Sequence, residues 1–99
     1  MSGVDVPNSK QFAVSNFPNP FNPSTKISYT IKGAGHLTMK IFNVRGELVK
    51  TLIDGHVEAS DSIVWNGTNN QGSSVSSGVY FYEARSGSDV VVNKMALVK

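Results

Sequence analysis

The sequence predicts an all-β domain, an immunoglobulin-like β-sandwich of about seven antiparallel strands. Val, Ile and Thr supply 23 residues against 9 for Leu and Ala, and branched side chains suit a pleated sheet better than a helix. Ser, Gly, Asn and Pro supply 35 of the 99 residues, which favours many turns. Between these turns, apolar and polar residues alternate with the period of a strand. A closed β-barrel is the alternative architecture.

The first half of the chain is expected to contain four strands. They are predicted at residues 12–17, 26–31, 37–41 and 47–53. Turn-forming residues at 33–35 and 43–46 separate the last three segments. Gly46 and Gly55 limit the fourth segment to strand length and argue against a helix there.

The second half is expected to contain three more strands, at residues 60–65, 79–85 and 90–98. The polar tract at 66–74 between the first two is predicted to be a surface loop. Trp65 and Tyr80 occupy positions typical of the core tryptophan and the tyrosine corner of immunoglobulin-like sandwiches.

Alternation along these segments also predicts which side chains face the core. The inward-facing apolar set comprises Ile27, Tyr29, Leu37, Met39, Ile41, Ile63, Trp65, Tyr80, Tyr82, Met95 and Leu97.

Composition excludes several classes of protein. The net charge is only +2 and the nine Lys and Arg residues are scattered, so no basic stripe is available for nucleic acid. Without cysteine the chain has neither disulfides nor Cys-ligated zinc. No apolar run approaches the roughly 18 residues of a membrane-spanning helix.

Residues 1–11 lack the features of a signal peptide and are expected to form a flexible lead-in or linker before a domain at 12–99.

The sequence offers little for catalysis or metal binding. His36 and His56 stand beside glycines and are expected to be exposed in turns, with no nucleophile motif to pair with them. The Asn-rich tract 66–72 contains no acid for a hard cation, so its asparagines are expected to stabilise a turn. We therefore expect a protein that is not an enzyme and needs no cofactor.

The most unusual segment is residues 17–25, which contain Pro18, Pro20 and Pro23. Proline lacks the amide donor that a central strand requires, so this segment is expected outside the sheets. One interpretation is a crossover that closes the end of the sandwich with Phe17 and Phe21. The alternative is a polyproline-type ligand for an aromatic groove.

Two motifs mark a resemblance to a known family. Residues 18–25 are Pro-Asn-Pro-Phe-Asn-Pro-Ser-Thr, and residues 94–99 are Lys-Met-Ala-Leu-Val-Lys. With the segments between them, residues 12–99 resemble the type A C-terminal sorting domain of type IX secretion cargo. The related Ig-like domain of flagellar hook-capping proteins is similar to the middle portion.

The resemblance implies a non-catalytic module at the C-terminus of a larger, Bacteroidetes-like secreted protein. Such a domain directs its cargo across the outer membrane through the type IX secretion system. It is then cleaved, or it anchors the cargo at the cell surface. The implied partners are the outer-membrane translocon, a sortase-like peptidase and an N-terminal cargo domain, and the implied location is secreted or cell-surface.

The resemblance also implies which residues carry the sorting signal. They are Pro18, Asn19, Pro20, Phe21, Asn22, Pro23, Lys94, Met95, Leu97 and Lys99. We expect the last strand to lie at a sheet edge, where a receptor could recognise its backbone and an exposed Lys94 by strand addition. The family usually has acids in the loop after the tryptophan, where this chain has Asn66, Asn69 and Asn70.

Two other functions remain as alternatives. The first is an accessory binding or spacer β-sandwich of a secreted enzyme, with Phe42 and Phe81 as candidates for a glycan-binding platform. The second is a structural assembly module like the hook-capping domain, which would self-associate.

Overall fold

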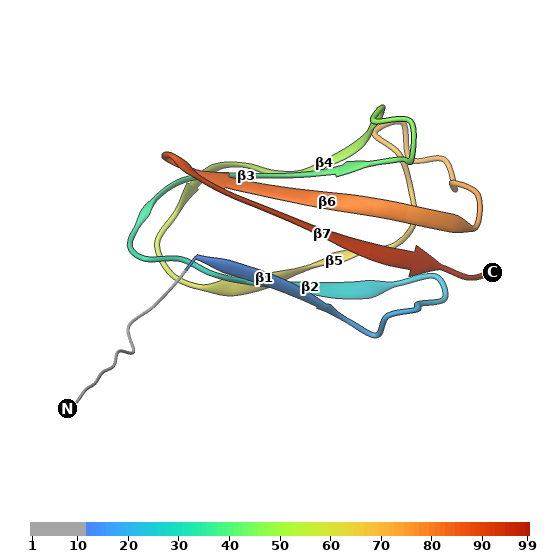
Figure 1. Cartoon of the computed structure of the whole chain (residues 1–99), viewed down its shortest axis with the longest axis horizontal. Helices are drawn as coiled ribbons and strands as arrows, with labels where there is room; N and C mark the ends of the chain where they lie inside the picture. Colours follow the sequence, from blue (N-terminus) through green and yellow to red (C-terminus); the bar gives the residue numbers. More distant parts are fainter. Residues whose placement is uncertain (1–11) are drawn as a thin grey trace.

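The computed structural model describes residues 12–99 and shows seven strands joined by turns and loops (Figure 1). The strands are β1 (Ala13–Phe17), β2 (Thr25–Thr30), β3 (Gly35–Phe42), β4 (Leu48–Val57), β5 (Asp61–Trp65), β6 (Gly78–Ser86) and β7 (Asp89–Leu97). Each predicted strand is present, which confirms the all-β class. No helix in residues 12–99 is long and apolar enough to cross a membrane.

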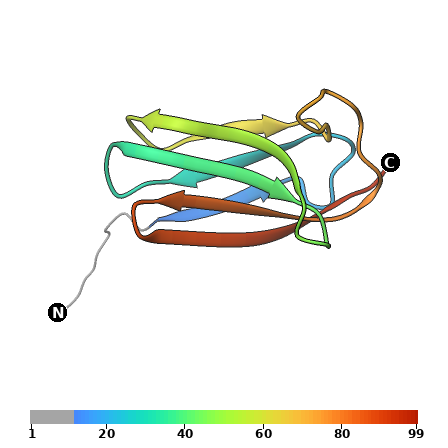
Figure 2. The ribbon, with the colours of Figure 1, turned by 90° about the horizontal axis from the view of Figure 1, so that it is seen from above.

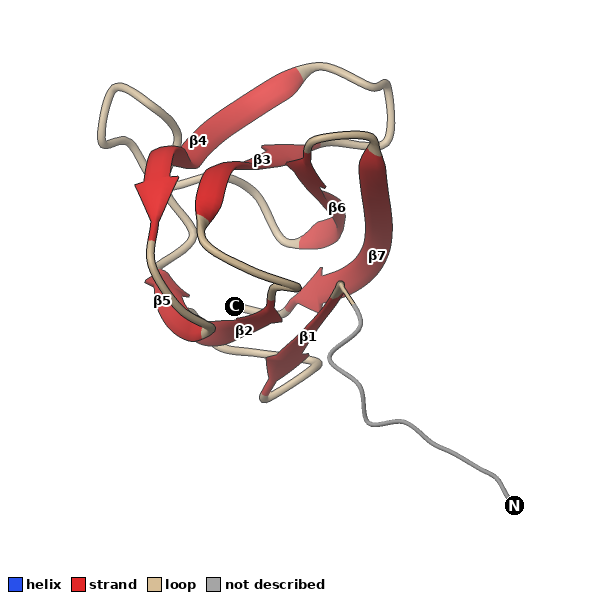
Figure 3. Ribbon diagram, turned by 90° about the vertical axis from the view of Figure 1, so that its left-hand side faces the viewer, coloured by secondary structure: helices blue, strands red, loops and turns tan. Residues whose placement is uncertain are grey.

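The strands form two antiparallel sheets that face each other. One sheet has the order β1-β2-β5 and the other β4-β3-β6-β7. Figure 2 shows the strands of both layers running along the same long direction, and Figure 3 shows the two layers facing each other. The predicted β-sandwich is therefore confirmed, and β7 lies at an edge of the larger sheet as expected.

The core follows from the alternation along the strands. In β3, Leu37, Met39 and Ile41 are fully buried while the residues between them are not. All predicted core residues are buried except Ile63, which is only partly buried because β5 is an edge strand of the smaller sheet. The prediction omitted Val14, Phe21, Ile31 and Ala84, which are also buried.

The expectation that Gly55 ends the fourth strand is wrong. β4 continues through Gly55 to Val57, because β3 offers paired backbone over the same length and Gly55 lies opposite Leu37. Pairing with a long neighbour thus outweighs the weak strand propensity of glycine.

The positions of the two histidines also differ from expectation. His36 and His56 lie directly opposite each other in β3 and β4, not in turns. They are exposed, and each imidazole pairs with a carboxylate, His36 Nε2 with Asp54 Oδ1 at 2.8 Å and His56 Nε2 with Glu58 Oε2 at 2.7 Å. Among residues 12–99 no group of three or more His, Asp or Glu side chains is placed to hold a metal ion.

The predicted aromatic landmarks are confirmed. The Trp65 indole is buried and donates a hydrogen bond from Nε1 to the Thr68 carbonyl at 2.9 Å. The Tyr80 hydroxyl donates to the Ser76 carbonyl at 2.7 Å, the upstream backbone bond of a tyrosine corner. The two rings meet edge to face at 5.3 Å between centroids.

The Asn-rich loop is stabilised as expected, by its own amide side chains. Asn69 Oδ1 accepts hydrogen bonds from the backbone amides of Gln71 and Ser73, both at 3.0 Å. Asn70 Oδ1 accepts from the Thr51 amide at 3.0 Å, which ties the loop to β4.

Candidate functional site

The segment of residues 18–23, here called the proline segment, lies against the C-terminal half of β7. Phe21 forms a parallel bridge with Leu97. Its amide donates to the Ala96 carbonyl at 2.9 Å, and its carbonyl accepts from the Val98 amide at 2.8 Å. Figure 1 shows this segment between β1 and β2, beside the end of β7. The two motifs are therefore joined by backbone pairing although they are far apart in sequence.

Asn19 adds a second connection to the same strand. Its Oδ1 accepts a hydrogen bond from the Ala96 amide at 3.0 Å, and its Nδ2 donates to the Lys94 carbonyl at 3.3 Å. One side-chain amide thus satisfies a donor and an acceptor of the β7 edge, as a neighbouring strand would. This explains why asparagine suits position 19.

Phe21 fixes the proline segment to the core. It is only 2% exposed, and its ring lies 5.7 Å from Trp65 between centroids. The expected closure of the sandwich end is confirmed for Phe21 but wrong for Phe17. Phe17 is 82% exposed because it is the last residue of edge strand β1 and alternates with the inward-facing positions.

A polar network supports the start of the proline segment. The Thr25 hydroxyl donates to the Pro18 carbonyl at 2.8 Å, and Asn16 Nδ2 donates to Thr25 Oγ1 at 3.1 Å. The Tyr82 hydroxyl donates to Asn16 Oδ1 at 3.0 Å and accepts from Asn93 Nδ2 at 3.3 Å. Burial raises the pKa of Tyr82, an effect that the hydrogen bond with Asn93 partly opposes.

Asn93 also links the two sheets, since its Nδ2 donates to the Val14 carbonyl of β1 at 2.7 Å. The network therefore joins β1, β6, β7 and the proline segment at one side of the sandwich.

Gly67 is a contributor that sequence reasoning missed. It is buried with φ +75°, and an added Cβ would lie 3.2 Å from the Pro23 carbonyl oxygen and 3.5 Å from Leu97 Cδ2. The Asn-rich loop thus packs closely on both the proline segment and the last strand. The only sequence signal was the Asn-Gly pair after Trp65, which indicates a turn but not its neighbours.

The structure separates the implied sorting residues into two groups. Phe21, Met95 and Leu97 are buried and hold the segments in place. The others are exposed: Pro18, Asn19, Pro20, Asn22, Pro23, Lys94 and Lys99. A partner of the folded domain can reach the second group directly, and of the first group it can reach Met95 where that residue lines a surface hollow.

Some of these exposed residues meet at a shallow hollow of about 170 Å³. It is lined by Asn19, Val79, Lys94, Met95 and Ala96. The hollow lies where the proline segment meets β6 and β7, so both motifs contribute to one surface.

An apolar row crosses the outer face of the larger sheet and ends at this surface. Phe42 lies opposite both Leu48 and Phe81, and Phe81 lies opposite Lys94. Phe42 and Phe81 are partly buried, and Leu48 is 48% exposed. The two phenylalanines are thus neighbours, as an aromatic platform requires.

The C-terminal half of the β7 edge is covered in the folded domain. The expected strand addition along the whole of residues 90–98 is therefore wrong for residues 94–98, because Asn19 and Phe21 already bond to Lys94, Ala96 and Val98.

Comparison with known proteins identifies a family and several similar folds. Residues 21–89 match the family described as the FlgD Ig-like domain. Among solved structures, dimeric latent PorU from Porphyromonas gingivalis matches with a TM-score of 0.73 and 21% identity, over 98% of this chain and 10% of that protein.

Two further structures share the fold. PorZ, a surface component of the type-IX secretion system of P. gingivalis, matches with a TM-score of 0.63 and 22% identity over 87% of this chain and 11% of its own. FlgD from Xanthomonas campestris, linked to hook capping in flagellar assembly, matches with a TM-score of 0.57 and 22% identity over 92% of this chain and 63% of its own. The chain thus spans about a tenth of PorU and PorZ. A search of curated proteins finds no match.

Proposed function

The chain belongs to the FlgD Ig-like domain family, and we propose that it serves as a type A C-terminal sorting domain. In this role it is a non-catalytic module of a larger protein. It directs that protein across the outer membrane through the type IX secretion system to the cell surface or the medium. Its partners are the outer-membrane translocon and a sortase-like peptidase, and it is then cleaved or anchors its cargo.

The observation that carries the proposal is the pairing of the proline segment with the end of β7. These are the segments on which the resemblance to sorting domains rests, and they share backbone hydrogen bonds and a common surface hollow. The fold shared with PorU and PorZ adds support, since PorZ is described as a component of this secretion system.

A reporter fusion tests the proposal. Residues 1–99 are placed at the C-terminus of a periplasm-directed reporter in a bacterium with a type IX system and in a translocon-deficient strain. We expect the reporter at the surface or in the medium only in the first strain. Equal retention in the periplasm of both strains would overturn the proposal.

Surface variants identify the signal within the fusion. Deleting residues 94–99 would also remove Met95 and Leu97 from the core, so charge reversal of Lys94 and Lys99 is the better variant. We expect this double variant to lower export while Ser73→Ala, in the Asn-rich loop, leaves it unchanged.

A second candidate is an accessory binding module, favoured by the paired Phe42 and Phe81 on the outer face. Neighbouring aromatic rings on a flat sheet face suit the apolar faces of sugars. A glycan array with the isolated domain tests it, with Phe81→Ala as the variant that should abolish any binding.

Sedimentation at micromolar concentration tests the assembly alternative, which predicts self-association.

A further inference from the structure

The N-terminal half of the β7 edge differs from the covered half. Ala96 and Val98 direct their backbone groups away from β6, toward the proline segment. Along an antiparallel strand, the backbone N–H and C=O groups of successive residues point alternately toward and away from the neighbouring strand. The amides and carbonyls of Val90 and Val92 therefore also point away from β6. Within residues 12–99, no strand pairs with β7 on that side from Asp89 to Asn93.

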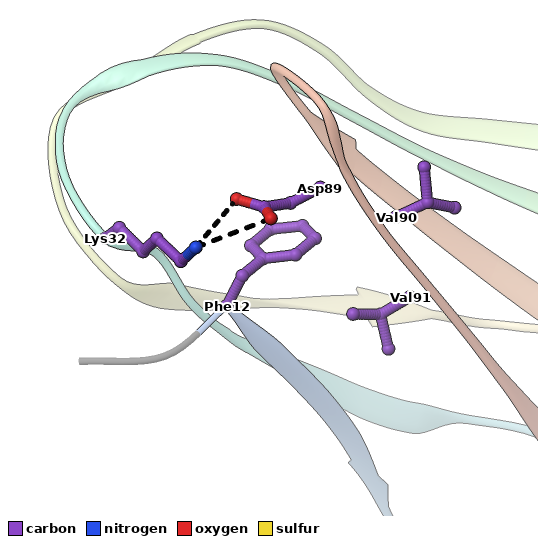
Figure 4. A pocket seen from close by; sticks show the side chains of 5 residues that line it. All are labelled: Phe12, Lys32, Asp89, Val90 and Val91. Atoms are coloured by element: carbon purple, nitrogen blue, oxygen red, sulfur yellow. Dashed lines mark hydrogen bonds and ion pairs between the residues drawn. The ribbon is translucent and has the colours of Figure 1, made fainter. Parts of the chain in front are cut away.

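A hollow of about 320 Å³ adjoins this open part of the edge. It is lined by Phe12, Lys32, Asp89, Val90 and Val91. Figure 4 shows the Phe12 ring beside the ion pair of Lys32 Nζ with Asp89 Oδ2, which measures 3.2 Å. Val91 and Phe12 supply apolar surface at the hollow, and the Lys32–Asp89 ion pair supplies polar surface beside it.

Beyond the Lys32–Asp89 ion pair, the edge has little of the usual protection against pairing. Edge strands are commonly blunted by charged side chains, proline or bulges. Here the outward side chains are Val90 and Val92, 44% and 52% exposed, and the ladder with β6 is regular from Asp89 to Leu97. Branched apolar side chains on a regular edge favour the addition of another strand.

We propose that this half of β7 is a docking site for an extended peptide, which adds as a further strand of the larger sheet. Its backbone pairs with the amides and carbonyls of Val90 and Val92. Every second side chain faces the hollow lined by Phe12, Val91 and the Lys32–Asp89 ion pair, where a short side chain with a methyl group and a hydroxyl fits. The inference rests on the proposed function for the origin of the peptide, which we assign to the export machinery.

A peptide strand fits this edge better than a second copy of the chain. Five residues extend only about 17 Å at ~3.4 Å per residue. The pairing of two such short segments buries far less than the roughly 1,200 Å² of a stable interface. A peptide that binds weakly and transiently needs only these backbone groups and the adjoining hollow.

Nuclear magnetic resonance with a synthetic probe tests the site. The probe is a capped six-residue peptide of alternating Thr and Val, and its twin is N-methylated at every second residue, which removes its donors on one side. We expect the probe at millimolar concentration to shift the Val90 and Val92 amide resonances and to slow their exchange, and the twin to have no effect. Equal effects of the twin, or shifts confined to β1 or β5, would overturn the proposal.

A proline variant tests the same site from the protein side. Val92→Pro removes an amide that points away from β6, so the ladder with β6 keeps its hydrogen bonds. We expect about tenfold weaker probe binding, and unchanged binding for the matched Val92→Thr, which keeps the amide and the branched shape. Shifts at Val90 and Val92 that grow with protein concentration alone would overturn the proposal in favour of a second copy.

The export assay separates this inference from the proposed function. If the unmodified reporter is exported, we expect Val92→Pro to lower its export and Val92→Thr to leave it unchanged. Normal export of Val92→Pro would overturn the assigned origin of the peptide while the sorting role stands. Failure of the unmodified reporter would instead overturn the proposed function.

Discussion

At the scale of single residues, Asn19 and Gly67 determine how the proline segment meets the last strand. Asn19 replaces a neighbouring strand by bonding to Lys94 and Ala96. Gly67 permits the close approach of the Asn-rich loop, because any side chain there would press on Pro23 and Leu97. The packing at Gly67 is testable through the free energy of unfolding.

Substitution of Gly67 by alanine tests the close packing. Gly67→Ala places a Cβ at a φ of +75° and 3.2 Å from the Pro23 carbonyl oxygen, so we expect a loss of about 2–3 kcal/mol. Gly72→Ala is the matched control, with φ +84° but nothing within 4 Å, and should cost only about 1 kcal/mol. Equal losses in urea denaturation would contradict the packing account.

The raised pKa values of three tyrosines predict how the free energy of unfolding depends on pH. Burial raises the pKa values of Tyr29, Tyr80 and Tyr82 above 10.0 in the folded state. The unfolded chain then releases these protons at a lower pH than the folded domain. The free energy of unfolding should therefore be retained below pH 10 and fall as the pH rises through the folded-state values.

Tyr82→Phe isolates one part of this effect. The variant should lose stability at neutral pH, because the hydroxyl joins Asn16 and Asn93. It should also show a shallower decline above pH 10 in urea titrations. An unchanged decline would show that Tyr82 does not contribute.

At the scale of elements, the proline segment depends on a single aromatic anchor. Phe21→Ala should cost about 3–5 kcal/mol, because a fully buried ring is lost beside Trp65. Phe17→Ala changes an exposed ring four residues earlier and should alter stability by less than about 0.5 kcal/mol. Thermal unfolding followed by Trp65 fluorescence measures both, and similar losses would contradict the assigned anchor.

The strands were predictable because their signals are local. Alternation identified β2, β3 and β6 with their core residues, and turn chemistry identified the Asn-rich loop. The length of β4 was not predictable from Gly55, because it depends on pairing with β3. The burial of Phe21 and exposure of Phe17 depend likewise on partners distant in sequence.

The candidate site was only partly predictable for the same reason. The proline segment and the last strand were identified separately, from motifs at the two ends of the domain. Their contact through Asn19 and Phe21 is a property of the fold. Alternation along the last strand did predict the burial of Met95 and Leu97 and the exposure of Lys94, because that signal is local.

At the scale of the whole molecule, both sheets serve to bring the proline segment and the end of β7 to one end of the sandwich. The covered half of the β7 edge presents the surface to which both motifs contribute. The open half presents backbone groups to a peptide. Our central claim is that the proline segment and the last strand act as one signal in the folded domain.

The most direct measurement is the exported fraction of the reporter fusion carrying Asn19→Ala, compared with Ser24→Ala. Ser24 is an exposed residue directly after the proline segment, lies outside the implied sorting set, and its side chain makes no hydrogen bond within residues 12–99. Both variants should remain folded by Trp65 fluorescence. The account predicts severalfold lower export for Asn19→Ala and normal export for Ser24→Ala, and equal export of the two variants would contradict it.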